Sequence, residues 1–115
     1  MPRPRIPRRV WFQPGVTYYK PAGVRMISLA EVIITVDEFE AIRLKDYEGL
    51  DQKEAAKKMG ISQPTFQRLY ESARKKIADA LVNGKAIRIE GGPFRMMGPG
   101  PGFGRGRRFR RGFNE

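Results

Sequence analysis

Three successive helix N-caps, separated by glycines, constrain the fold of this chain more than any other feature. Thr35 is followed by Glu38 and Asp51 by Glu54, and both pairs have the spacing of a capping box, in which side chain and backbone cap each other reciprocally. Ser62 caps a third segment that carries a proline in its first turn, where a missing backbone N–H does no harm. The pattern predicts helices that end near residues 47, 59 and 83.

Apolar spacing predicts how these helices pack. Gly60 permits a left-handed turn between the second and third helices, and small Ala56 stands where their backbones come closest. The residues that face each other across this turn are Ala55, Met59, Ile61, Phe66 and Leu69. The expected apolar face of the first helix comprises Phe39, Ile42, Leu44 and Tyr47. Residues 86–89 form a candidate short strand, which could pair with residues 32–36 or with a second subunit. Residues 32–36 themselves are either a short strand or a buried approach to the first helix. We therefore expect a mainly α fold: a three-helix helix-turn-helix domain with one or two short strands and basic disordered arms.

Positive charge is concentrated at the two ends of the chain. The net charge is +11, of which residues 1–25 contribute +6 and residues 95–115 contribute +5, whereas residues 26–94 are formally neutral. The predicted organisation is a Pro-rich arm over residues 1–23, a domain over 24–92 and a Gly/Arg/Phe-rich disordered tail over 93–115. Trp11, Phe12, Tyr18 and Tyr19 are apolar enough to dock part of the arm on the domain. Basic arms of this kind bind polyanions, although they also serve as solubilising tails.

Residue usage argues against catalysis and against a metal or cofactor. The chain has no Cys and no His, which removes thiol nucleophiles, the usual zinc ligands and the commonest general base. The clustered carboxylates Asp37, Glu38 and Glu40 lie in the first turn of a helix, where acids favour the macrodipole. No stretch approaches the roughly 18 apolar residues of a membrane span, and the first residues are charged and proline-broken. We expect a cytoplasmic protein that is not an enzyme and that needs no membrane, metal or cofactor.

The polar start of the third helix supplies the candidate recognition residues. Gln and Arg can form paired hydrogen bonds to adenine and guanine edges in the major groove. The candidate base contacts are Ser62, Gln63, Thr65, Gln67 and Arg68. The candidate phosphate contacts are Arg74, Lys75 and Lys76, which would equally suit a solvated helix face. Further DNA contacts are predicted for Arg3, Arg5, Arg8 and Arg9 in the arm. The tail arginines are candidate contacts to DNA, RNA or another protein, and they are Arg105, Arg107, Arg108, Arg110 and Arg111.

The segment from Thr35 to Gly92 resembles the UPF0251 (DUF134) family of predicted DNA-binding proteins. The resemblance rests on EFEAIRL, on the E-G-L before the second helix, on G-I-S-x-P-T-F and on NGKAIRIEGG, and the opening PRPRIPRRVWFQPGVTYYKPAG is also similar. The likeness implies a helix-turn-helix similar to region 4 of bacterial sigma factors, with residues 62–68 in the groove. RNA polymerase thereby becomes a further candidate partner.

The leading functional hypothesis is a sequence-specific regulator that binds double-stranded DNA with the helix beginning at Ser62. A homodimer is expected, because a core of about 70 residues is marginal in size and such regulators are commonly symmetric. The alternative is an RNA, single-strand or architectural nucleic-acid binder that uses the Arg/Gly-rich tail. An anionic membrane surface is a further polyanion, but the chain shows no convincing basic amphipathic helix.

Overall fold

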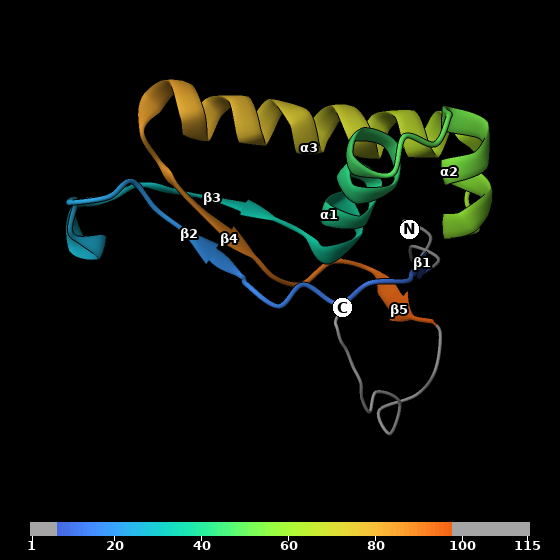
Figure 1. Cartoon of the computed structure of the whole chain (residues 1–115), viewed down its shortest axis with the longest axis horizontal. Helices are drawn as coiled ribbons and strands as arrows, with labels where there is room; N and C mark the ends of the chain where they lie inside the picture. Colours follow the sequence, from blue (N-terminus) through green and yellow to red (C-terminus); the bar gives the residue numbers. More distant parts are fainter. Residues whose placement is uncertain (1–6, 98–115) are drawn as a thin grey trace, which may run out of the picture.

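The computed structural model describes residues 7–97 (Figure 1). The elements are β1 (Arg8–Val10), β2 (Tyr18–Tyr19), the 3-10 turn η1 (Met26–Ser28), β3 (Glu31–Ile34), α1 (Val36–Ile42), the π-helical turn η2 (Arg43–Tyr47), α2 (Gln52–Met59), α3 (Gln63–Asn83), β4 (Ala86–Ile89) and β5 (Phe94–Met96). Helix α3 runs along one side of the molecule, with α2 crossing its N-terminal end and strands β2, β3 and β4 beneath its C-terminal half.

The strands form two small sheets, and this finding corrects the prediction of a mainly α fold. In the first sheet the order is β2-β4-β3, with β4 parallel to β3 and antiparallel to β2. Strands β1 and β5 form a separate parallel pair. The described part of the chain is therefore an α/β mixture with three α-helices and five strands. The prediction was wrong because β1, β2 and β5 contain only two or three residues each, too few to show a period in sequence.

The predicted caps are present, although the second is only half formed. Thr35 and Glu38 make a complete capping box at the start of α1. At α2 the Asp51 side chain accepts the backbone N–H of Glu54 at 2.8 Å, and no reciprocal bond is formed by Glu54. The first helix reaches Tyr47 as expected, but its last turn is π-helical. That turn leaves Tyr47 82% exposed, so Tyr47 does not belong to the apolar face to which it was assigned.

Two clusters of buried side chains hold the fold together. The first lies among the helices and contains Ala41, Leu44, Ala55, Ala56, Met59, Phe66, Leu69 and Tyr70. The second joins the strands to α1 and α3 and contains Val10, Ile34, Val36 and Ile89, with Phe39, Ile77, Ile87 and Phe94 packed against it. Because Val10 is completely buried, the N-terminal segment contributes to the core.

Part of the predicted N-terminal arm is a strand-containing segment of the domain. Arg8 to Val10 pair in register with Phe94 to Met96, and Tyr18 pairs with Arg88. The backbone amide of Trp11 donates a 2.8 Å hydrogen bond to the buried carboxylate of Glu40. The prediction of disordered arms therefore fails for residues 8–19 and for β5. Residues 1–6 and 98–115 lie outside the described part of the chain.

Candidate nucleic-acid interface

Helices α2 and α3 are joined by a tight turn that fixes their relative placement. Gly60 ends α2 with φ +70°, a left-handed conformation that glycine adopts without steric cost. The amides of Gly60 and Ile61 donate to carbonyls of the last turn of α2, so the turn is held by backbone hydrogen bonds. Across it, Met59 and Phe66 are completely buried in one cluster. The apolar contact leaves the outer side of α3 to polar residues.

The five candidate base contacts occupy the first turns of α3, but their side chains differ in availability. Ser62 is the N-cap: its hydroxyl accepts the backbone N–H of Thr65 and donates to the Thr65 hydroxyl at 2.9 Å. These two residues therefore stabilise the start of the helix. Gln63 is exposed, and its backbone carbonyl accepts a hydrogen bond from the side-chain amide of Gln52 on α2. Within residues 7–97, Arg68 forms no hydrogen bond or ion pair and is exposed.

Glu71 belongs to the same outer face, and sequence reasoning missed it. Its carboxylate accepts a hydrogen bond from the side-chain amide of Gln67, which fixes the orientation of that amide. The four-residue spacing of a glutamine and a glutamate was the signal available in sequence. A carboxylate here can accept a hydrogen bond from the amino group of cytosine, and it also repels phosphate.

The three candidate phosphate contacts point in different directions around α3. The Arg74 guanidinium lies over the ring of Tyr70 and donates to its hydroxyl, which in turn donates to Asp46 at 2.6 Å. The hydrogen bond to Asp46 is the main cause of a raised Tyr70 pKa, and burial adds to it. Lys76 instead forms a 2.8 Å ion pair with Glu38. Lys75 is exposed between them, so the structure does not bring the three together as one cluster.

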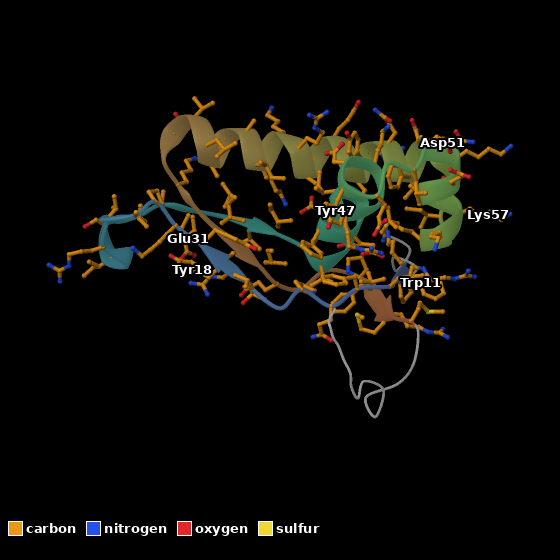
Figure 2. The ribbon with its side chains drawn as sticks, viewed as in Figure 1. Trp11, Tyr18, Glu31, Tyr47, Asp51 and Lys57 are labelled. Atoms are coloured by element: carbon orange, nitrogen blue, oxygen red, sulfur yellow. The ribbon has the colours of Figure 1, made fainter. Side chains whose placement is uncertain are left out.

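Two of the four candidate DNA contacts of the arm lie in the described part of the chain, and the other two lie outside it. Arg8 and Arg9 belong to β1, whereas Arg3 and Arg5 lie outside the described residues, as do all five candidate arginines of the tail. The Arg9 side chain lies against the interhelical turn, since a Cβ added to Gly60 would be 2.9 Å from Arg9 Nε. Trp11 extends this attachment: its indole N–H donates to the Lys58 carbonyl at the end of α2, beneath which it lies in Figure 2. Strand β1 is thus fixed beside the helix pair.

Glu38 links the start of α1 to the middle of α3. One carboxylate oxygen accepts the Thr35 amide and the Lys76 ammonium, and the other accepts the Ser72 hydroxyl at 2.6 Å. Burial by itself raises the pKa of Glu38, but the hydrogen bonds from Lys76, Ser72 and the Thr35 backbone outweigh it, and the pKa is lowered. The carboxylate therefore stays charged at neutral pH and keeps α1 and α3 in register.

A second polar cluster lies on the outer face of the three-stranded sheet, away from α3. Arg88 forms an ion pair with Glu31 at 2.9 Å and stacks on Tyr18, and Figure 2 shows Tyr18 and Glu31 side by side. The hydrogen bond from Arg88 lowers the pKa of Glu31 despite an opposing effect of burial. The cluster is electrically balanced and covers the open face of the sheet.

Residues 7–97 contain no group of three or more Asp, Glu, Cys or His side chains placed to hold a metal ion. None of the described helices combines the length and the apolar composition needed to cross a membrane.

Comparison with known proteins places the chain among its relatives. The family model described as a protein of unknown function, DUF134, matches residues 1–97. The chain belongs to the DUF134 family. A UPF0251 protein of Moorella thermoacetica is 63% identical over 99 residues, which cover 86% of this chain and 66% of the relative. One from Thermoanaerobacter pseudethanolicus is 57% identical over 112 residues, covering 97% and 95%, and one from Caldanaerobacter subterraneus is 60% identical over 98 residues, covering 85% and 83%. No solved structure matches the chain.

Proposed function

We propose that this DUF134 protein is a sequence-specific double-stranded DNA-binding protein that acts as a transcriptional regulator. In this proposal α2 and α3 form a helix-turn-helix, similar to region 4 of sigma factors, and the first turns of α3 enter the major groove. The observation that carries the proposal is the buried contact of Met59 and Phe66 across the Gly60 turn, which leaves the start of α3 exposed and polar. An α-helix presented in this way fits the width of the major groove.

The side chains of the helix pair suit the two kinds of contact that such a complex needs. Gln63 and Gln67 carry amides able to pair with adenine. Lys53, Lys57 and Lys58 are exposed on α2, and Figure 2 shows Lys57 projecting away from the domain. A row of cations on the first helix suits the phosphate backbone that this helix crosses in known complexes.

The test is selection of the purified full chain against a random duplex library in about 0.15 M salt, followed by binding as a function of salt. We expect one enriched motif, and a palindromic motif would support a homodimer. No enrichment together with a steep salt dependence would contradict sequence-specific binding and favour the RNA or architectural alternative.

A pair of glutamine substitutions tests the placement of α3 directly. Gln67→Ala should remove discrimination at one base pair, roughly 1–3 kcal/mol, while leaving binding to random duplex unchanged. Gln13→Ala, at an exposed glutamine outside the helix pair, is the matched control. It should change neither the discrimination between base pairs nor the affinity for random duplex. If Gln67→Ala keeps the full base preference of the wild type, then α3 does not read the groove at this residue.

A further inference from the structure

One groove brings together basic residues that are far apart in the sequence. Its volume is about 580 Å³, and one wall is formed by a row of residues on α3. The opposite wall is formed by Arg8 of β1 and by Thr35 and Glu38 at the start of α1. The residues of the α3 wall are Thr65, Arg68, Leu69, Ser72 and Lys76. We call this feature the α3 groove.

The helical repeat explains why one wall carries so many polar groups. Residues three and four apart lie on one side of a helix, so Thr65, Arg68, Ser72 and Lys76 form a single stripe. The stripe flanks the exposed face of α3 where Gln67 and Glu71 lie. A ligand in the α3 groove therefore sits beside the face proposed to read bases.

The acidic group in the groove is already neutralised by its neighbours. The Glu38 carboxylate accepts hydrogen bonds from Thr35, Ser72 and Lys76, as described above. A lysine ammonium has three N–H groups, so Lys76 keeps donors beyond the one given to Glu38. The groove thus has hydrogen-bond donors to offer an anion, but no uncompensated negative charge.

Arg8 and Arg68 complete the positive character of the groove. Arg8 Nε lies 3.9 Å from the buried carboxylate of Asp37, and its side chain is only 11% exposed. The pairing of β1 with β5 fixes its backbone, so Arg8 is a positioned cation. Arg68 has no ion-pair partner within the described residues, which leaves one full positive charge among the residues that line the groove.

We propose that the α3 groove binds one phosphodiester of the DNA backbone, with Arg68 and Lys76 as donors and Arg8 as a fixed cation. This inference rests on the proposed function and assigns Arg68 to the backbone, whereas the sequence made it a candidate base contact. A phosphate held in the α3 groove fixes the position of helix α3 in the major groove of the DNA without reading the base sequence. The N-terminal segment then contributes through a strand that is part of the fold.

The experiment uses Arg68→Gln in the full chain, because this residue is exposed and unpaired within the described region, so the variant should fold. Binding to the selected target and to random duplex is measured between 50 and 200 mM salt. The substitution should weaken the affinity for the target and for random duplex by the same factor. It should also reduce the slope of log affinity against log salt concentration by about 0.9. Across that range the wild-type affinity should therefore fall about 3.5-fold more than that of the variant.

Arg25→Gln is the matched control, because it removes the same charge from an exposed site near η1, at the end of the molecule away from β1 (Figure 1). It should leave the slope closer to wild type than Arg68→Gln does. Equal slopes for the two variants would overturn the proposal, as would a changed base preference in Arg68→Gln, which would make Arg68 a base contact. A further outcome is that the wild type selects no sequence while Arg68→Gln still flattens the salt slope on random duplex. In that case the phosphate site in the α3 groove is supported, and the proposal of sequence-specific DNA binding is contradicted.

Discussion

Replacing Glu38 by glutamine should destabilise the protein, because three hydrogen bonds converge on this carboxylate. Its donors are the Thr35 amide at 2.9 Å, the Lys76 ammonium at 2.8 Å and the Ser72 hydroxyl at 2.6 Å. Glutamine has the same shape but is uncharged and has only one acceptor oxygen, so the ion pair with Lys76 is lost and Ser72 must reverse its hydrogen bond to accept from the new amide. Hydrogen bonds to charged groups contribute about 1.5–3 kcal/mol, and the partly exposed Lys76 can turn to water. We expect a loss of about 2–3 kcal/mol in the free energy of unfolding.

Urea denaturation at pH 7 measures this loss, and α2 supplies a matched control. Glu54 occupies the same position relative to its N-cap as Glu38, but its side chain makes no capping bond. Glu54→Gln should therefore change the free energy of unfolding by less than about 0.5 kcal/mol, as surface substitutions usually do. Thermal unfolding should show the same contrast, at about 4 to 8 °C per kcal/mol for a domain of this size.

The dependence of stability on pH provides an independent check. The pKa of Glu38 is lower in the folded protein than in the unfolded chain, so its contribution is complete above the unfolded value of about 4.3. The contribution is lost as the pH falls through the folded pKa. The difference in unfolding free energy between wild type and Glu38→Gln should thus be constant near neutral pH and shrink below about pH 4. A difference independent of pH, or a loss no larger than that of Glu54→Gln, would refute the role given to this carboxylate.

Two further substitutions test the anchoring of β1 and the outer face of α3. Glu40→Gln should cost about 3 kcal/mol in urea denaturation, because the buried Glu40 carboxylate pairs with Arg43 and accepts the Trp11 amide. The fluorescence of the single tryptophan should shift with it, and an unchanged emission spectrum would mean that β1 does not depend on this bond. Glu71→Gln should raise the affinity for random duplex several-fold at low salt by removing a negative charge beside Gln67, and unchanged binding would place Glu71 away from the DNA.

Local sequence signals located the helices well, because caps and turns depend on neighbours along the chain. Thr35, Asp51 and Ser62 cap the three helices as predicted, and Gly60 takes the left-handed conformation that its place between two helices indicated. The apolar spacing correctly placed Phe66 in the core between α2 and α3. These features need no knowledge of distant segments.

The candidate site was only partly predictable. The five candidate base contacts do lie at the start of α3, but the sequence could not show that the Thr65 hydroxyl is bound to the Ser62 cap or that Gln67 is held by Glu71. Arg74 and Lys76 appeared equivalent in sequence, and each turned out to have a different partner on a different side of α3. Side-chain partners depend on the neighbouring elements and not on residue type alone.

Family membership and the positions of the helix ends follow from the residues themselves, because they reside in motifs and in the backbone preferences of adjacent residues. The two sheets, the burial of Val10 and the groove between Arg8 and Arg68 were decided by the tertiary structure. Strands of two or three residues have no stability of their own and form only when a distant strand supplies hydrogen bonds. For the same reason a proline-rich, basic segment that reads as a free arm becomes part of the core once β5 and Glu40 are in place to receive it.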